Sequence, residues 1–150
     1  MKDTHDANGN MTTVTTSCGT TTLTWDARNR LVGMNGYSLT STCAPVAASF
    51  RYDALGRRIE KTFNGKTTQY LYDGLDIVQE KENGVVTVNY IRTLNIDEPL
   101  ARMESGGKVR YYHSDALGSV IALTDETGAS RTQYIYDSFG NITMAGEASN

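Results

Sequence analysis

The fold is indicated by one short stretch, Phe50-Arg51-Tyr52-Asp53-Ala54-Leu55-Gly56-Arg57. Phe50 and Tyr52 alternate with a charged residue, as side chains do on the two faces of a β-strand. Asp53 suits the first position of a type I turn, because its carboxylate accepts a backbone N–H two residues further on. Gly56, at the fourth position, tolerates the positive φ angle that restarts a strand. The stretch therefore predicts a strand, a tight turn and a second strand.

We interpret six intervals of this kind, each from an aspartate to a residue that tolerates positive φ three positions later, as turns. Four of these aspartates also follow two large apolar residues at strand spacing, which are Leu23 and Trp25, Phe50 and Tyr52, Tyr70 and Tyr72, and Tyr134 and Tyr136. The aspartates are 20, 27, 20, 42 and 22 residues apart, and the interval of 42 divides into 24 and 18 if Asp97 is counted. The period is therefore about 21 residues. The six predicted turns are Asp6 to Gly9, Asp26 to Asn29, Asp53 to Gly56, Asp73 to Asp76, Asp115 to Gly118 and Asp137 to Gly140.

A second series of turn signals lies between the aspartates. Asn-Gly and Gly-Gly pairs favour two-residue hairpin loops, because both central residues must take positive φ. The two series together predict an all-β fold, an antiparallel meander of stacked hairpins with strands of about six residues and no helix beyond a turn or two. Thr124–Gly128 is interpreted as a hairpin with an acidic tip. The second series comprises Asn35-Gly36, Asn64-Gly65, Asn83-Gly84, Gly106-Gly107 and Thr127-Gly128.

The composition agrees with a sheet and excludes several classes of protein. Nine Tyr against three Phe and one Trp, with many Thr, suit a pleated surface that is exposed on one side. With 21% charged residues and a net charge of -3, the chain offers no basic surface for nucleic acid or an anionic membrane. No apolar run reaches transmembrane length, and the polar residues 1–10 contain no signal peptide.

The pattern predicts three regions of unequal regularity. Residues 1–49 are an irregular region with longer loops, residues 50–142 are a regular hairpin array, and residues 143–150 form a frayed tail. The longest step between turns contains Ile96-Asp97-Glu98-Pro99, a degenerate repeat whose Pro99 is expected on an edge strand or in a loop.

The two cysteines, Cys18 and Cys43, lie on either side of the second repeat. Their spacing matches no zinc or redox motif. A bridge between neighbouring hairpins and two free thiols are both consistent with the sequence.

The repeated pattern Tyr-Asp-x-x-Gly-Arg/Asn-apolar resembles the YD repeat of the RHS family. This family includes bacterial polymorphic toxins, outer components of insecticidal toxin complexes and animal teneurins. Residues Tyr111–Ser119 resemble the opening of the conserved RHS core region. The residues that carry the resemblance are Tyr52–Arg57, Tyr72–Gly74, Tyr136–Asn141, and the variants His5–Asn10 and Trp25–Arg30.

The resemblance implies a fold, a function and a location. In the family the meander winds as a twisted strip into a hollow shell, and in toxins the shell encloses a variable C-terminal effector. The chain stops after the start of the core region, so the self-cleavage aspartates and the toxic domain of the family have no counterpart in it. We therefore expect a non-catalytic structural module of a secreted or cell-surface protein, a twisted strip or partial shell. Its expected partners are the rest of an RHS shell or another copy through open sheet edges, and a toxin cargo or glycan.

The residue types that support catalysis or metal binding have simpler explanations here. Each repeated Asp has a partner in its own turn, so we interpret these residues as turn formers and predict no metal, cofactor or catalytic site. Asp6-x-Asn8-Gly9-Asn10 lacks the distal Glu of a calcium loop. His5 and His113 stand at or beside aromatic positions of other repeats, and Ser114 and Ser119 belong to no nucleophile motif.

The aromatic residues before the turns are the candidate contact surface. Trp25, Tyr52, Tyr72 and Tyr136 occupy equivalent positions, so neighbouring hairpins are expected to stack them in a spine. The alternative is an adhesion module that uses a Tyr-rich face to bind a glycan or a protein. A hydrolase or self-cleaving protease is the third hypothesis. Arg57, Arg58, Lys61 and Lys66 are interpreted as a solvated face or as cross-strand partners of Glu60 and similar acids.

Overall fold

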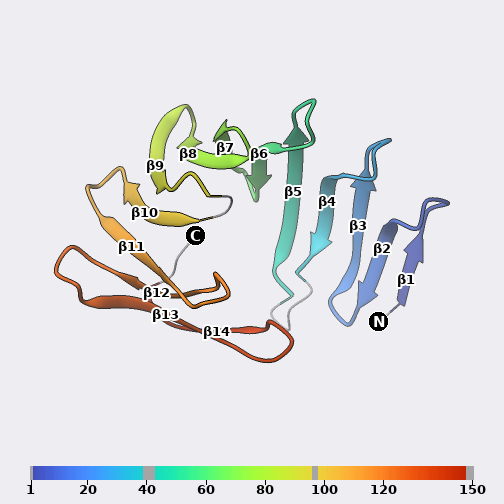
Figure 1. Ribbon diagram of the computed structural model, residues 1–150. Helices are drawn as coiled ribbons and strands as arrows, with labels where there is room; N and C mark the ends of the chain where they lie inside the picture. Colours follow the sequence, from blue (N-terminus) through green and yellow to red (C-terminus); the bar gives the residue numbers. More distant parts are fainter. Residues whose placement is uncertain (1, 39–42, 96–97, 148–150) are drawn as a thin grey trace. The chain divides into compact units, whose positions relative to one another are not determined.

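The computed structural model describes residues 2–38, 43–95 and 98–147. Strands follow one another in the order β1 to β14, and each pairs with its neighbours in the chain (Figure 1). The described residues contain no helix, so the predicted all-β meander is confirmed. The strands are β1 (Lys2–His5), β2 (Met11–Thr16), β3 (Gly19–Trp25), β4 (Leu31–Tyr37), β5 (Pro45–Tyr52), β6 (Arg58–Phe63), β7 (Lys66–Asp73), β8 (Asp76–Glu82), β9 (Val85–Arg92), β10 (Pro99–Glu104), β11 (Val109–Ser114), β12 (Val120–Thr124), β13 (Ser130–Tyr136) and β14 (Ile142–Gly146).

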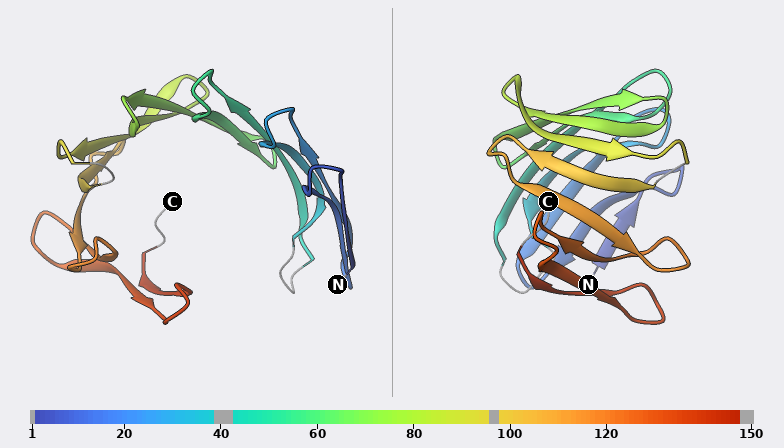
Figure 2. Two further views of the ribbon diagram at one scale, coloured as in Figure 1. Left: turned by 45° about the vertical axis from the view of Figure 1, so that its right-hand side comes forward. Right: turned by 60° about the vertical axis from the view of Figure 1, so that its left-hand side comes forward.

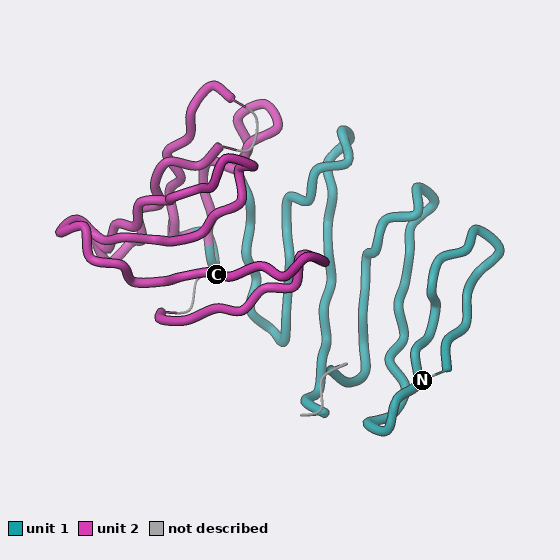
Figure 3. The backbone as a smooth tube through the Cα atoms, turned by 60° about the horizontal axis from the view of Figure 1, so that its bottom comes forward, with its two compact units in different colours: residues 1–70, 82–84 teal, residues 71–81, 85–150 magenta. Residues whose placement is uncertain are grey.

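The chain divides into two compact units, which Figure 3 colours separately. The first comprises Met1–Tyr70 with Glu82–Gly84, and the second comprises Leu71–Lys81 with Val85–Asn150. In both units, hairpin follows hairpin along the chain (Figure 2). The division into regions at residues 49 and 142 stays a prediction.

The buried side chains of the first unit share one face of the sheet. Val14 of β2 lies opposite Thr21 of β3, and Val46 of β5 lies opposite Gly36 of β4; residues opposite each other in an antiparallel pair point to the same side. The other face carries threonines, of which Thr15 and Thr20 share a hydrogen bond of 2.9 Å between their hydroxyls. The core is therefore a narrow band, and most side chains of the unit are half-buried or exposed.

The second unit buries both apolar and charged groups. Leu123 of β12 lies opposite Thr132 of β13, and both side chains are almost fully buried. Arg102 of β10 lies opposite Arg110 of β11, and these two residues are only 5% and 6% exposed. Two buried guanidinium groups on adjacent strands require counter-charges close by.

Two predicted hairpin loops are confirmed. Asn64 and Gly65 have φ angles of 48° and 85°, and Asn83 and Gly84 have φ angles of 51° and 81°. Both central residues are left-handed, as a two-residue loop of type I′ requires.

The predicted loop at Asn35-Gly36 was wrong, because both residues lie inside β4. Gly36 has a φ of 145°, and a Cβ there would lie 2.6 Å from Thr21 Cα. The Thr21 hydroxyl donates to the Tyr37 carbonyl at 2.8 Å and accepts the Tyr37 N–H at 2.9 Å. Gly36 therefore allows the backbones of β3 and β4 to lie close together. The chain reverses after Gly36, between β4 and β5.

The loops at Gly106-Gly107 and Thr127-Gly128 also differ from the prediction. Only Gly107 and Gly128 have positive φ, of 79° and 81°. Their N–H groups donate to the carbonyls of Glu104 at 2.9 Å and Asp125 at 3.0 Å. Both are thus turns with an acidic residue first and glycine fourth, the same form as Asp53 to Gly56. An acidic residue three positions before the glycine decided the turn type.

Two expectations near the C-terminal half need correction. Pro99 opens β10 opposite Arg92, next to a register irregularity, so it lies neither on an edge strand nor in a loop. The first position of a strand tolerates a residue without an N–H. β14 (Ile142–Gly146) forms where a frayed tail was expected, because β13 pairs with it along its whole length. Residues 96–97 and 148–150, to which the degenerate repeat and the rest of the tail were assigned, lie outside the described residues.

The structure resolves the alternative that the sequence left open for the cysteines. Cys18 and Cys43 form a disulfide bond, with their Cα atoms 5.0 Å apart. The bridge joins the β2–β3 loop to the segment before β5. Among the described residues, no helix is long and apolar enough to cross a membrane.

Candidate functional site

The carboxylate of Asp53 is bound entirely within its own turn. One oxygen, Oδ1, accepts the Arg57 N–H at 2.9 Å, and the other, Oδ2, accepts Arg57 Nε at 2.6 Å. The Gly56 N–H donates to the Asp53 carbonyl at 3.1 Å, and Gly56 has a φ of 88°. Arg57, which follows Gly56 in the repeat, therefore stabilises the turn with its side chain.

Four other aspartates of the series have the same turn geometry. Asn10 and Asn141 donate from their side-chain amides to Asp6 at 2.9 Å and Asp137 at 2.7 Å. Arg30 takes this role for Asp26, with Nε at 2.8 Å. Around Asp115 the donors are backbone N–H groups, from Leu117 and Ser119, both at 2.9 Å. The residue after the left-handed position thus donates a side-chain hydrogen bond to the carboxylates of Asp6, Asp26 and Asp137. The Asp115 carboxylate accepts hydrogen bonds from backbone N–H groups.

These donors hold the carboxylates in the ionised form. The side-chain hydrogen bond from Arg30 lowers the pKa of Asp26 below its ordinary value. Side-chain hydrogen bonds from Asn10 and Asn141 lower the pKa of Asp6 and Asp137 in the same way. A carboxyl group with a lowered pKa is a poor general acid or base near neutral pH.

The predicted turn from Asp73 to Asp76 has a different geometry. Gly74, with a φ of 58°, is the left-handed residue, and Asp76 is the first residue of β8. Asp76 accepts Arg92 NH1 at 3.2 Å instead of closing a turn. Gly74 pays no steric penalty at positive φ, so the hairpin closes with two residues.

Sequence reasoning did not place Asp125 in the aspartate series, although Asp125 to Gly128 has the required interval. Its Oδ1 accepts the Thr127 and Ala129 N–H groups at 2.9 and 3.1 Å, and Oδ2 accepts Arg131 Nε at 2.6 Å. Hydrogen bonds led by the Thr127 hydroxyl lower the pKa of Asp125. Asp125 lies in the β12–β13 turn, at the opposite edge of the sheet from the turns of Asp115 and Asp137. Aspartate turns therefore occur at both edges of the sheet.

Turns at the same edge of the first unit contact one another. Asn10 Nδ2 donates to Asn29 Oδ1 at 2.8 Å, which joins the first turn to the second. Arg28 NH1 donates to the Ala54 carbonyl at 3.2 Å, and Arg30 NH1 donates to the Asp53 carbonyl at 3.3 Å. The polar groups of successive repeats therefore bind the neighbouring repeat and do not converge on a shared pocket.

Three of the four predicted spine residues are anchored to the strand before their own. In each case the ring belongs to the last residue of its strand and donates to the carbonyl of the first residue of the preceding strand. The bonds are Trp25 Nε1 to Met11 at 2.7 Å, Tyr52 hydroxyl to Leu31 at 2.8 Å, and Tyr136 hydroxyl to Val120 at 2.8 Å. Tyr72 is half-buried near the end of β7.

Arginines lie over the ring of Tyr52, at the places where neighbouring rings were expected. The guanidinium carbons of Arg30 and Arg58 are 4.7 and 5.8 Å from the ring centroid. Predicted spine residues occupy every second strand, so successive rings are about 10 Å apart at the usual strand spacing, beyond the range of a ring pair. Arg30 just before β4 and Arg58 at the start of β6 fill the distance around Tyr52 with cation–π contacts.

The remaining candidate residues have local partners. His113 Nε2 is 2.9 Å from the Thr124 hydroxyl, and His5 Nε2 is 3.7 Å from Asp3. Glu60 pairs with Arg51 at 3.4 Å. Within the described ranges, no group of three or more His, Cys, Asp or Glu could hold a metal ion.

Of the four basic residues interpreted as a solvated face or as cross-strand partners of acids, three have described contacts, and the pairing of Lys66 with Glu82 agrees with the second interpretation. Arg57 pairs with Asp53, Arg58 lies over the Phe50 ring at 4.7 Å, and Lys66 pairs with Glu82 at 2.7 Å. These contacts join neighbouring strands or close a turn, and they form no shared basic surface.

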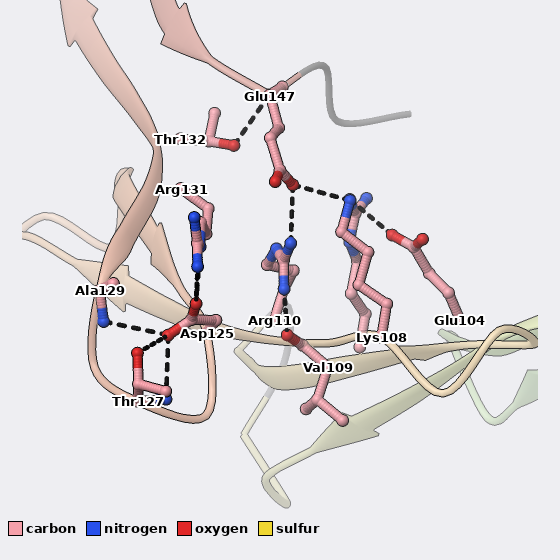
Figure 4. Close-up of polar contacts among 11 residues, drawn as sticks. Glu104, Lys108, Val109, Arg110, Asp125, Thr127, Ala129, Arg131, Thr132 and Glu147 are labelled. Atoms are coloured by element: carbon pink, nitrogen blue, oxygen red, sulfur yellow. Dashed lines mark hydrogen bonds and ion pairs between the residues drawn. The ribbon is translucent and has the colours of Figure 1, made fainter.

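A group of charged residues in the second unit surrounds a cavity of 320 Å³, which is lined by the start of β11, the β12–β13 turn, Arg131 of β13 and Glu147 just after β14 (Figure 4). Glu147 Oε2 is 2.7 Å from both Lys108 Nζ and Arg110 NH2. These two hydrogen bonds, from Arg110 first and Lys108 second, lower the pKa of Glu147 to about 2. Arg131 and its partner Asp125 form another side of the cavity. Sequence reasoning missed this group, because Glu147 follows Arg110 by 37 residues.

Comparison with protein families and curated proteins finds a consistent set of relatives. Residues 5–36 match the family model described as RHS Repeat. The tRNA3(Ser)-specific nuclease WapA of Bacillus spizizenii and the tRNA nuclease WapA of Bacillus subtilis strain 168 are each 37% identical over 149 residues. Each alignment covers 97% of this chain and 6% of the relative. The double-stranded DNA deaminase toxin A of Burkholderia cenocepacia is 26% identical over 166 residues, which cover 92% of this chain and 11% of that protein.

Two solved structures of TcdB2-TccC3 have the same fold. TcdB2-TccC3 without its hypervariable C-terminal region has a TM-score of 0.64 and 18% identity over 96% of this chain and 8% of that chain. TcdB2-TccC3-TEV has a TM-score of 0.57 and 14% identity over 99% of this chain and 9% of that chain. The chain spans less than a tenth of the length of these structures and of the WapA relatives.

Proposed function

The chain belongs to the RHS-repeat family, and we propose that it is a non-catalytic structural module, one section of an RHS-type β-shell that encloses or presents a C-terminal effector. The observation that supports this proposal most is that the repeated carboxylates accept hydrogen bonds within their own turns. Asp53 and its counterparts are hydrogen-bonded inside their own turns, with a lowered pKa wherever a side chain closes the turn. We assign these aspartates the role of turn formers and the anchored rings the role of a structural spine.

The mechanism of such a module is geometric. Each hairpin leaves backbone donors and acceptors unpaired at its edge, and the next hairpin satisfies them. β1 pairs with β2 and β14 pairs with β13, and the described residues offer no second partner strand for either. The partners that fit these edges are strands of another RHS segment or another copy of the chain. A toxin cargo fits a shell, and a secreted or cell-surface location fits the family.

The names of the relatives support this function indirectly. A nuclease and a deaminase share these repeats while acting on different nucleic acids, which suggests that the repeats carry the common architecture and other segments the chemistry. The net charge of -3 likewise offers no general attraction for nucleic acid.

A chimaera tests the shell function. In the WapA of Bacillus subtilis strain 168, the matching segment is either replaced by this chain or deleted, and limited proteolysis measures how well the C-terminal part of WapA is protected. We expect the chimaera to keep the resistance of WapA and the deletion to lose it. Equal protease sensitivity of the chimaera and the deletion would refute the proposal, as would a deletion as resistant as WapA itself.

The two competing functions have direct tests on the isolated chain. Intact mass after long incubation is expected to stay unchanged, and tRNA and double-stranded DNA are expected to remain uncut; cleavage of either would favour the enzyme. An adhesion module predicts glycan-array binding that is lost in Tyr→Ala variants. The structure favours this alternative less, because the Tyr52 and Tyr136 hydroxyls already donate within the chain.

A further inference from the structure

Lys108 and Arg110 converge on one point in the second unit. Both belong to the segment from the β10–β11 turn into β11, and both place a nitrogen 2.7 Å from the same oxygen of Glu147 (Figure 4). The Arg110 side chain is 8% exposed, whereas that of Glu147 is 41% exposed. The Arg110 guanidinium is therefore a buried element of the sheet, whereas the Lys108 side chain, 38% exposed, and the Glu147 carboxylate lie on the solvent side.

The Arg110 guanidinium has a second hydrogen-bond partner besides Glu147. Arg110 NH1 donates to the Val109 carbonyl at 2.7 Å, and the residue pairs with Arg102 across the strand. Arg102 is itself bound to Glu104 at 3.0 Å and keeps a buried Nε with no hydrogen-bond partner. A second buried guanidinium on the same face raises the attraction of this place for any anion.

Glu147 is held by its backbone independently of its carboxylate. Its N–H donates to the Arg131 carbonyl at 2.8 Å, and its carbonyl accepts the Thr132 hydroxyl at 2.8 Å. The side chain is thus a carboxylate tethered beside a cavity of 320 Å³ that also opens toward Arg131. The geometry is that of a ligand supplied by the chain itself.

We infer that Lys108 and Arg110 form a binding site for a peptide carboxylate, and that Glu147 occupies this site in cis. An Asp or Glu side chain of another polypeptide segment binds the same two cations when it displaces Glu147. Two charge-assisted hydrogen bonds to one oxygen are the chemistry that the site offers, and the cavity provides room for the arriving chain. A tethered competitor has an effective concentration in the millimolar range or above, so removing it strengthens binding of an external carboxylate on the order of tenfold or more.

The test is a titration of the full chain with acetyl-Gly-Glu-Gly amide, followed by NMR at the amides of Lys108, Val109 and Arg110. The Glu147→Gln variant keeps the backbone bonds of residue 147 and removes the charge. We expect it to bind the peptide at least tenfold more tightly than the unmodified chain. Addition of Lys108→Gln to this variant is expected to reverse most of the gain. Glu126→Gln, at the same cavity, is the matched control for the loss of one negative charge, and we expect it to tighten binding by less than about twofold.

Three results would overturn the inference: equal binding by Glu147→Gln and the unmodified chain, equal binding of acetyl-Gly-Gln-Gly amide, or tighter binding of inorganic phosphate than of the glutamate peptide. The amides of Thr143 and Ala145 report whether β14 stays paired. If Glu147→Gln releases β14, Glu147→Asp keeps the charge but shortens the side chain, and severalfold tighter peptide binding is then expected. Unchanged binding by Glu147→Asp in that case would also refute the site.

Discussion

Gly56 isolates the energetic cost of a left-handed turn position. It has a φ of 88°, and a Cβ built there meets no atom within 4 Å. Substitution therefore adds backbone strain without a steric clash. An L-residue other than glycine in this region costs about 1–2 kcal/mol, so we expect Gly56→Ala to lower the free energy of unfolding by about 1 kcal/mol. Gly56→Val should cost about 2 kcal/mol or more, because a β-branched side chain is stiffer.

An asparagine substitution at Gly56 tests the same argument with a residue that tolerates positive φ. Asn29 takes a φ of 57° at the equivalent position of its own turn. Gly56→Asn is therefore expected to cost less than Gly56→Ala, in the range of a few tenths of a kcal/mol. Gly33 is the matched control in the same unit, since it lacks positive φ and an added Cβ would make only an ordinary contact of 3.6 Å with Thr24. Gly33→Ala should change stability by less than about 0.5 kcal/mol.

The assay is urea unfolding monitored by the fluorescence of Trp25, the single tryptophan, which lies in the same unit as Gly56 and Gly33. With an m-value of about 2 kcal/mol/M, Gly56→Ala lowers the midpoint by about 0.5 M and Gly56→Val by about 1 M. The order Asn, Ala, Val is the essential result. Equal midpoints for Gly56→Val and Gly33→Ala would show that the backbone strain argument is wrong.

Four more predictions follow from the same geometry. Gly140→Val, at a φ of 80° with no atom within 4 Å of the added Cβ, should lower the unfolding free energy by more than about 1 kcal/mol by circular dichroism, and a neutral result would count against its turn. Gly36→Ala should cost about 3 kcal/mol or more in urea unfolding, because its Cβ would lie 2.6 Å from the Thr20 carbonyl oxygen; a cost as small as that of Gly33→Ala would contradict this. Reduction of the Cys18–Cys43 bond, which closes a loop of 25 residues, should lower the urea midpoint by an amount equivalent to about 3 kcal/mol, and an unchanged midpoint would refute it. The pKa of Glu147, about 2 against an ordinary 4.5, should rise toward 4.5 in Lys108→Gln; its contribution to stability is present above pH 4.5 and is lost as the pH falls toward 2, and carboxyl NMR checks both.

Local turn chemistry explains why much of the fold could be predicted. Asp53 and Gly56, or Asn64 and Gly65, carry the whole signal within four residues, since the bonds that form the turn lie within it. Asn35-Gly36 has an equally strong local signal but lies within a strand, because Gly36 must admit Thr21 of the neighbouring strand. That requirement depends on register, which a local pattern does not contain.

The contacts that sequence reasoning missed span longer intervals. The pairing of Arg110 with Glu147 depends on how β12 to β14 bring residue 147 back to β11. Arg58 was expected to lie on a solvated face or to pair with an acid, but it contacts Tyr52, as Arg30 does, because Arg30 just before β4 and Arg58 at the start of β6 flank the end of β5. The position of an aromatic residue could thus be predicted from the repeat. The residue that contacts its ring could be identified only once the order of the strands was known.

The uninterrupted strand order from β1 to β14 has a consequence for how such chains change in length. Since every strand pairs with its neighbours in the chain, one hairpin can be gained or lost without rerouting any other connection. Folding can likewise start at any hairpin and extend along the chain, because no pairing waits for a distant segment to arrive. A gene that encodes such an array can therefore vary by recombination in whole periods of about 21 residues, and each product keeps every remaining turn intact.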